Sequence, residues 1–231
     1  MVDLVKLSQE VLLASKLGKE INFFNKRIEE INTDCLFQFL PDDNSKKAFW
    51  LNIYNTFIIQ RLSSNWKDKD FYSARFIEFK DLKLSFDDIE HGILRKSKIK
   101  LGLGFLNKWK VTDWENALRV NDLDYRVHFA LNCGANSCPP ITNYSVENVN
   151  KQLCSNTKNY LFDTSVFSTT RSNRVKVPRL FLWYFADFGG FKGIKNIYRK
   201  YNLVPIDAEP KFSFLSYDWT MNIENFSVDF K

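Results

Sequence analysis

The sequence predicts a helix-rich α+β protein with a central, mostly antiparallel or mixed sheet and a buried apolar helix. Apolar residues at helical spacing outnumber segments of strand-like alternation, and the two kinds do not alternate regularly along the chain. No repeat, low-complexity tract or Gly/Ser/Pro-rich linker divides the 231 residues, which favours a single domain over residues 1–231. The 22 Phe, 9 Tyr and 6 Trp residues predict an unusually aromatic core.

The N-terminal region is predicted to be helical. Residues 4–32 carry apolar side chains at helical spacing, in two stretches broken near Gly18. We therefore expect a helical pair within residues 1–40, packed on a core formed by residues 45–222.

A third predicted helix covers residues 46–63 and is apolar on almost every face, so we expect it in the middle of the core. Asn52 and Asn55 share one face of this helix with Thr56. Buried amides need hydrogen-bond partners. These side chains are therefore expected either to anchor a loop or to face a site.

Ser85 and Asp88 form a capping-box pattern that predicts a helix over residues 86–96. Asp87, His91 and Arg95 fall on one face of it, at intervals of four residues. A neighbouring carboxylate, from Asp87 or Glu90, is expected to orient the imidazole of His91 and favour its protonated form.

Residues 126–133 have the pattern of a buried strand, followed by turn residues at 134–137. Alternation along a strand would direct Cys133 into the core with Phe129, away from the face of His128.

The remaining elements are predicted as a helix after Ser145, a strand at 173–177, an aromatic helical turn at 181–188 closed by Gly189 and Gly190, a helix at 191–201 and a final strand near 212–219.

Residues 128–140 hold one of the chain's two histidines and two of its four cysteines, which marks this segment as the candidate site. One interpretation is a cysteine-dependent hydrolase or acyl transferase. Cys138, which follows the turn, would then be the nucleophile, and His91 the base, oriented by Asp87 or Glu90. The turn amides would lower the thiol pKa or hold an oxyanion.

Three alternatives stay open. Zinc accepts a ligand set such as His91, His128, Cys133 and Cys138, but the two cysteines are spaced more widely than in most zinc knuckles. A redox disulfide between these cysteines is also possible across the turn. Finally, the protein could be a non-enzymatic binding or scaffold module with an aromatic groove for a peptide. We expect no metal and no cofactor.

The net charge of +6 is spread along the chain and accompanies no recognisable nucleic-acid module, so nucleic-acid binding is not expected. Arg95 and Arg126 lie next to the two histidines in the sequence. If both reached one cleft, the ligand would be an anionic small molecule. Charged residues interrupt the start of the chain, and no apolar run is long enough to span a bilayer, which predicts a cytoplasmic protein without a membrane partner.

Several stretches together resemble the domain-of-unknown-function 547 family. They are AFWLNIYNTFIIQRL at 48–62, FDDIEHGILR at 86–95, VHFALNCGANSCPPI at 127–141 and FLWYFADFGG at 181–190, with LSYDWTMN at 215–222 resembling the usual ending. The resemblance covers roughly residues 45–222. It implies a globular domain found in bacteria and plants, and it supplies no agreed activity or catalytic residues.

The sequence thus predicts a site of twelve residues. The predicted catalytic residues are Cys138, His91, Glu90 and Asp87. The predicted binding residues are Asn52, Asn55, Arg95, Arg126, His128, Cys133, Gly134 and Ser137.

Overall fold

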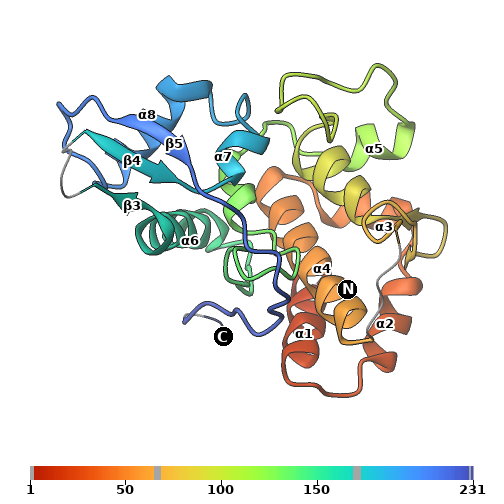
Figure 1. The fold of residues 1–231 in the computed structure, drawn as a ribbon. Coiled ribbons are helices and arrows are strands. Elements are labelled where there is room, and N and C mark those ends of the chain that lie inside the picture. The colour runs from red at the N-terminus through yellow and green to blue at the C-terminus, as the bar shows by residue number, and fades with distance from the viewer. Residues whose placement is uncertain (1–2, 65–68, 169–172, 229, 231) are drawn as a thin grey trace.

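The computed structural model describes residues 3–64, 69–168, 173–228 and 230, and it has the predicted helix-rich α+β architecture (Figure 1). The α-helices are α1 (Leu4–Lys16), α2 (Asn22–Glu29), α3 (Thr33–Phe39), α4 (Asp43–Ser63), α5 (Asp113–Leu118), α6 (Val149–Thr164), α7 (Leu180–Trp183) and α8 (Gly190–Lys200). A π-helix, η1 (Asp88–Leu94), and a 3-10 helix, η2 (Tyr125–Phe129), complete the helical elements described.

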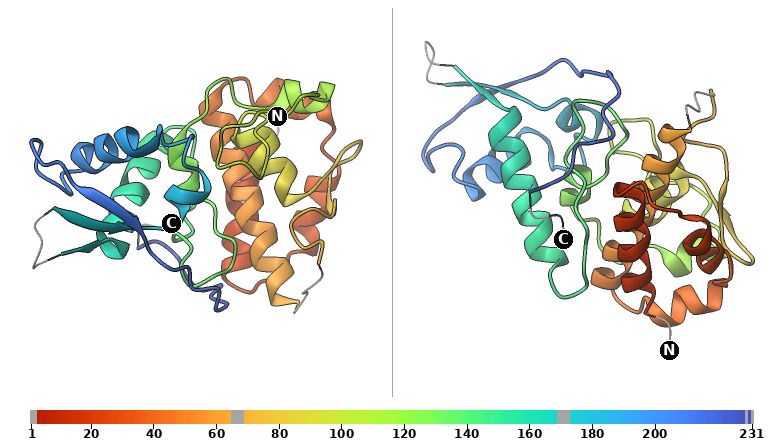
Figure 2. Two further views of the ribbon diagram at one scale, coloured as in Figure 1. Left: turned by 45° about the horizontal axis from the view of Figure 1, so that its top comes forward. Right: turned by 90° about the horizontal axis from the view of Figure 1, so that it is seen from below.

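The strands form two small sheets. They are β1 (Ile77–Glu78), β2 (Lys83–Leu84), β3 (Val166–Phe167), β4 (Arg174–Val177) and β5 (Lys211–Phe214). β1 and β2 pair antiparallel, whereas β4 pairs antiparallel with β3 and parallel with β5, Val175 lying opposite Phe212. The larger sheet is therefore mixed, as predicted, but it lies at one side of the molecule beside α6 and α8 (Figures 1 and 2).

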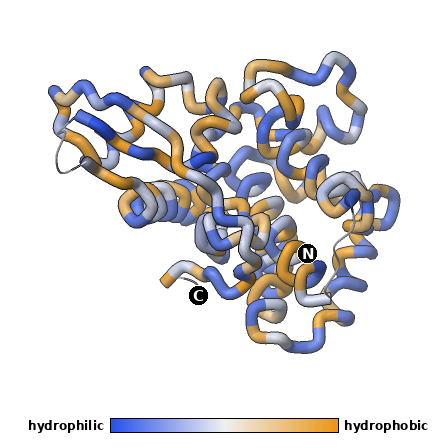
Figure 3. The backbone as a smooth tube through the Cα atoms, in the orientation of Figure 1, coloured by the Kyte–Doolittle hydropathy of each residue, from blue (hydrophilic) through white to orange (hydrophobic). Residues whose placement is uncertain are grey.

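Helix α4 is the buried apolar helix that the sequence predicts. A capping box of Asp42 and Ser45 begins it, and the side chains of Phe49 and Trp50 are fully buried. One apolar cluster surrounds α4, and a second packs α6, α7 and α8 against the larger sheet. Hydrophobic residues are accordingly spread over both sides of the molecule (Figure 3). No helix within the described ranges is long and apolar enough to cross a membrane.

Two buried amides on α4 hold the loop that carries the candidate site. Asn52 donates to the carbonyl of Tyr144 at 2.9 Å and accepts from its amide at 2.9 Å. Asn55 donates to the carbonyl of Ala130 at 3.0 Å and accepts from the amide of Asn132 at 3.0 Å. These pairs satisfy groups that would otherwise be buried without partners. Of the two roles predicted for these side chains, loop anchoring is the one that the contacts show.

The predicted strand over residues 126–133 is wrong. The Asp124 carboxylate accepts from the Arg126 amide at 3.1 Å and begins the 3-10 helix η2, and an irregular loop follows it. The side chain of Asn55, on helix α4, bonds the backbone of this loop. The loop backbone therefore needs no neighbouring strand as a hydrogen-bond partner.

The other element boundaries differ by less. The break near Gly18 is confirmed, with a positive φ of 60° at that residue, and α3 is a third helix in the region where the sequence predicts a helical pair. The helix predicted to follow Ser145 begins at Val149. Gly190 does not only close the aromatic turn but is the first residue of α8.

Candidate functional site

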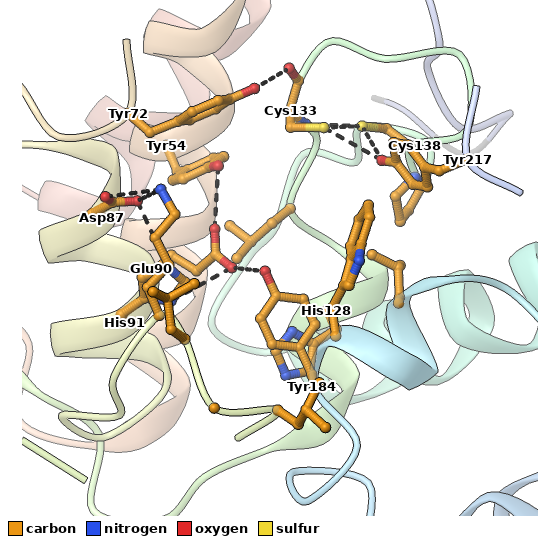
Figure 4. Close-up of a pocket in the computed structure, with 18 of the residues that line it drawn as sticks. Tyr54, Tyr72, Asp87, Glu90, His91, His128, Cys133, Cys138, Tyr184 and Tyr217 are labelled. Carbon is orange, nitrogen blue, oxygen red and sulfur yellow. Dashed lines mark hydrogen bonds and ion pairs between the residues drawn. The ribbon is translucent and has the colours of Figure 1, made fainter. Parts of the chain in front are cut away.

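A pocket of about 350 Å³ opens between η1, the loop after η2, α7 and the segment after β5 (Figure 4). Its wall is mainly aromatic and apolar, formed by Tyr54, Tyr72, Leu101, Gly102, Leu103, Leu131, Pro139, Leu180, Trp183, Tyr184, Tyr217 and Trp219. Its polar and ionisable lining consists of Asp87, Glu90, His91, Lys100, His128, Cys133 and Cys138.

The pocket brings together half of the predicted site residues. All four predicted catalytic residues line it, as do His128 and Cys133. Six predicted binding residues do not: Asn52, Asn55, Arg95, Arg126, Gly134 and Ser137.

Those six residues have other partners. Arg95 lies fully buried behind the lining, and Arg126 pairs with Asp124 at 2.6 Å, so the two arginines do not meet in one cleft. Gly134 has a φ of 85°, and an added Cβ there would displace the end of the Leu62 side chain. The Ser137 hydroxyl accepts from the Asp218 amide at 2.9 Å and fastens the turn to the C-terminal segment.

The most reactive feature of the lining is a pair of free thiols. The sulfur atoms of Cys133 and Cys138 lie 2.7 Å apart. The Tyr217 hydroxyl contacts both, at 3.4 Å from Cys133 and 3.1 Å from Cys138, and the Cys133 amide donates to the Cys138 sulfur at 3.1 Å. The prediction that Cys133 points into the core, apart from Cys138, is therefore wrong. It depended on strand alternation that this loop does not have.

The two thiols differ in acidity. The hydrogen bond from Cys138 lowers the pKa of Cys133 to about 7, with further bonds from the Tyr217 hydroxyl and the Ala135 amide outweighing the effect of burial. Burial, followed by the neighbouring Cys133, raises the pKa of Cys138 well above its ordinary value. Cys133 is thus the more acidic thiol and the first of the two to ionise as pH rises.

The turn amides are predicted to lower the thiol pKa or to hold an oxyanion, but most of them are bonded within the protein. The Gly134 amide donates to the Asn132 side chain at 2.7 Å. The amides of Asn136 and Ser137 donate to carbonyls of the C-terminal segment at 2.7 and 3.2 Å. The Ala135 amide does lower the pKa of both thiols. A row of turn amides free to hold an oxyanion does not form, because a distant segment takes up the other donors.

His91 lies across the pocket from Cys138 (Figure 4). Its Nδ1 is 2.9 Å from the Arg95 guanidinium, and its Nε2 is 3.6 Å from the Asp87 carboxylate. A guanidinium can only donate, so Nδ1 must accept, and the ring proton is on Nε2. Burial, together with the Arg95 charge, lowers the pKa of His91 despite its two acidic neighbours. The prediction of a favoured protonated form is therefore wrong.

A buried charged network supports the pocket floor. The Arg95 guanidinium donates to Asp187 at 2.7 Å, and Nε2 of His128 lies 2.9 Å from the same carboxylate oxygen. The Arg95 and Asp187 side chains are both 0% exposed. The His128 ring stacks on Tyr184 with 3.9 Å between ring centroids. This network fixes His128 and Tyr184 as a rigid part of the wall.

The π-helix η1 places the acidic groups of the site. Glu90 accepts from the Tyr184 hydroxyl at 2.6 Å and from the Tyr54 hydroxyl at 3.4 Å. Burial alone would raise the pKa of Glu90, but His91, the Tyr184 hydroxyl and Arg95 hold it below its ordinary value. Lys100 bonds Asp87 at 2.9 Å, whereas no Lys or Arg of the described residues lies within ion-pair distance of Glu90. The lining therefore carries a carboxylate whose ion-pair neighbour among the described residues is Nδ1 of His91, at 3.7 Å.

Both histidines should make the fold sensitive to mild acid. Burial is the main cause that lowers the pKa of His91 and of His128 below the ordinary 6.5. Below pH 6.5 the unfolded chain takes up protons that the folded protein does not. The free energy of unfolding therefore decreases as the pH is lowered below 6.5. We expect a loss of up to about 1.4 kcal/mol per pH unit for each histidine.

Urea unfolding measured between pH 7 and pH 5 tests this. The double variant His91→Gln/His128→Gln should show a much flatter dependence than the unsubstituted protein. Carboxylates whose pKa is lowered, such as Glu90 and Asp187, contribute only below about pH 4.5. Equal slopes for the two proteins above pH 5 would contradict the assignment.

Sequence reasoning missed Tyr184, Asp187 and Tyr217. A signal existed for the first two, because an aspartate inside the aromatic run FLWYFADFGG is unusual for a core segment. Tyr217 follows β5 and reaches the thiols from more than 75 residues away in the sequence. Nothing in the sequence around it indicates that contact.

The contacts of the two histidines bear on the zinc interpretation. His128 bonds Asp187 and His91 bonds Arg95, so the two rings are engaged away from the thiols. Within the described ranges, no group of three or more His, Cys, Asp or Glu side chains is arranged to hold a metal ion.

The buried helix α4 and the thiol-bearing loop both lie within a stretch of the chain that matches a family model. The model of the family described as "Protein of unknown function, DUF547" matches residues 37–161, and the chain belongs to this family. No curated protein and no solved structure matches the chain. The matched residues include η1 and both pocket cysteines, whereas Tyr184, Asp187 and Tyr217 lie beyond them.

Proposed function

We propose that this protein is a cysteine-dependent enzyme that carries out thiol–disulfide exchange in the pocket. The observation that carries the proposal is the pair of thiols, 2.7 Å apart in the pocket wall and unequal in acidity. A more acidic thiol beside a less acidic one is the arrangement that suits attack by the first and resolution by the second.

The exchange proceeds in two steps. The Cys133 thiolate attacks one sulfur of a substrate disulfide RS–SR′, forms the Cys133–SR mixed disulfide and releases R′S⁻. Cys138 then loses its proton to solvent, attacks the Cys133 sulfur and expels RS⁻, leaving a Cys133–Cys138 disulfide. The substrate is reduced by two electrons, the pair is oxidised by two, and an external thiol restores it.

The pair is also suited to this order of events. The negative charge on Cys133 contributes to the raised pKa of Cys138. That charge disappears when Cys133 enters the mixed disulfide, so the pKa of Cys138 falls when its attack is required. The Tyr217 hydroxyl, in contact with both sulfurs, can donate to whichever carries the charge.

The lining favours a substrate with an apolar or aromatic body that is neutral or cationic. Aromatic side chains form most of the wall, and Glu90 adds a carboxylate that has no Lys or Arg of the described residues within ion-pair distance. The anionic ligand predicted from Arg95 and Arg126 has less support, because neither side chain lines the pocket.

Hydrolysis or acyl transfer, the activity predicted from the sequence, is the second candidate. The lowered pKa of Cys133 favours it, since a thiolate is also an acyl-transfer nucleophile. The predicted dyad of Cys138 and His91 has less support, because Nδ1 of His91 accepts from Arg95 and the two side chains lie across the pocket. This candidate requires one thiol, whereas exchange requires both.

Single-cysteine variants separate the two candidates. With oxidised glutathione at pH 7, the unsubstituted protein should release two thiols per chain and form the Cys133–Cys138 disulfide, seen by mass spectrometry of peptides. Cys138→Ser should stop at a glutathione adduct on Cys133. Cys133→Ser should react much more slowly, because burial alone, even without a charge at position 133, raises the pKa of the remaining thiol. Cys35→Ser, distant from the pocket, is the control.

Other results would count against exchange. Equal rates for the two single variants would contradict the proposed order of attack. Hydrolysis of a thioester or an activated ester that survives Cys138→Ser but not Cys133→Ser would favour the second candidate.

A further inference from the structure

Residues 98–110 form a hairpin-like loop that exposes an unusual number of apolar side chains. It leads from η1 toward α5 (Figure 1) and is closed by a bridge between Lys98 and Asn107. Leu101 is 77% exposed, Phe105 63% and Trp109 fully exposed. Ile99, Leu103 and Leu106 are also exposed, which gives six large apolar side chains in residues 99–109. Isolated exposed apolar residues are normal on a protein surface, whereas a contiguous group marks an interaction surface.

The same loop is basic. Residues 98–110 contain no Asp or Glu, but they hold Lys98, Lys100, Lys108 and Lys110. Lys100 and Lys108 pair with Asp87 and Glu115. In the described part of the chain, neither Lys98 nor Lys110 has a carboxylate within ion-pair distance. The exposed apolar side chains of this loop are thus accompanied by two lysines without a carboxylate partner.

We propose that this loop docks the protein on an anionic phospholipid surface. Transfer of exposed Leu and Phe side chains out of water lowers the free energy, and Trp is favoured at the membrane–water interface. Lysines beside them are attracted by the negative surface potential of such a membrane. The combination of apolar tip and uncompensated lysines selects an anionic bilayer over a neutral one.

This proposal differs from the prediction of no membrane partner. That prediction depended on the absence of an apolar run long enough to span a bilayer. A loop that enters only the interface needs no such run, because its few apolar side chains reach the boundary between headgroups and acyl chains.

The docked orientation would place the pocket beside the lipid. Leu101, Gly102 and Leu103 belong both to the loop and to the pocket lining. The loop is held on the protein by the Ala186 amide, which donates to the Leu103 carbonyl at 2.9 Å. Docking therefore brings the pocket opening to the membrane surface, whatever chemistry the thiols perform.

Co-sedimentation with lipid vesicles tests the proposal. The full chain should bind vesicles of phosphatidylcholine with a quarter phosphatidylserine at least tenfold more strongly than pure phosphatidylcholine vesicles, and added salt should weaken it. Leu101→Ser/Trp109→Ser should lower the partition coefficient at least tenfold. Lys98→Ala/Lys110→Ala should lower it about 25-fold, or about fivefold for each lysine. Ile206→Ser, at a site 79% exposed on another surface, should bind unchanged.

Leu101, Trp109, Lys110 and Ile206 are exposed and Lys98 is half-buried, so the thermal midpoints of the variants should match that of the unsubstituted protein. Equal binding to the two vesicle types, or binding that survives both double variants, would overturn the proposal. Loop-dependent self-association in size-exclusion chromatography without vesicle binding would overturn it as well, in favour of contact between copies.

Discussion

Asp187→Ala should destabilise the protein by about 3–5 kcal/mol, because removing one partner of a buried ion pair leaves the other charge uncompensated. Arg95 and Asp187 are bonded at 2.7 Å and have no exposed side-chain surface. Without the carboxylate, the polar side-chain contact left to Arg95 is Nδ1 of His91. His128 would also lose the acceptor of its Nε2 proton. Urea unfolding at pH 7 measures the difference.

Two controls separate burial from charge. Glu78→Ala removes an ion pair with Lys83 whose side chains are 48% and 60% exposed, and it should cost less than about 1 kcal/mol. Arg95→Met/Asp187→Leu replaces both charges with apolar groups and should recover much of the stability lost by Asp187→Ala alone. A cost for Asp187→Ala as small as that for Glu78→Ala would show that Arg95 reaches water.

Gly193→Ala should cost about 3 kcal/mol or more through a backbone collision. Gly193 lies in the first turn of α8, where an added Cβ would overlap the carbonyl oxygen of Phe188. A backbone atom cannot rotate away as a side chain can, so the start of α8 must shift. Because Phe188 follows Asp187 directly, the shift should also disturb the network beneath the pocket.

The matched control is Gly18→Ala. Gly18 has a φ of 60°, but nothing lies within 4 Å of its added Cβ. That substitution should cost only the strain of a left-handed residue, about 1–2 kcal/mol. Thermal and urea unfolding of both variants gives the comparison. Equal costs would mean that the approach of Gly193 to Phe188 is looser than described.

The sequence allowed elements with local signals to be predicted. The apolar surface of α4, the alternation of β4 and the helical spacing of α8 are present in contiguous residues, and all three elements form. The capping pattern of Ser85 and Asp88 likewise appears as reciprocal hydrogen bonds of 3.0 Å. Local chemistry determines these features, so a short window contains the information.

Features that depend on distant partners could not be predicted. The segment after η2 has the composition of a strand, but its backbone is hydrogen-bonded by Asn55 on α4 and not by a neighbouring strand. Because no strand forms, Cys133 and Cys138 are not separated as predicted. The state of His91 depends on Arg95, whose own partner Asp187 is 92 residues away. The pattern identified six lining residues, but it could not indicate which thiol is the more acidic.

The attachment of the thiol-bearing turn to the C-terminal segment has a consequence for synthesis of the chain. Asn136 and Ser137 donate to the carbonyls of Thr220 and Asp218, and Asn222 donates back to Gly134. A ribosome produces the turn first and these partners more than 75 residues later. Until then the two cysteines are held by neither Tyr217 nor this segment, and they are open to oxidation or mispairing. A nascent chain stalled before residue 215 should therefore react with a thiol reagent without preference between Cys133 and Cys138.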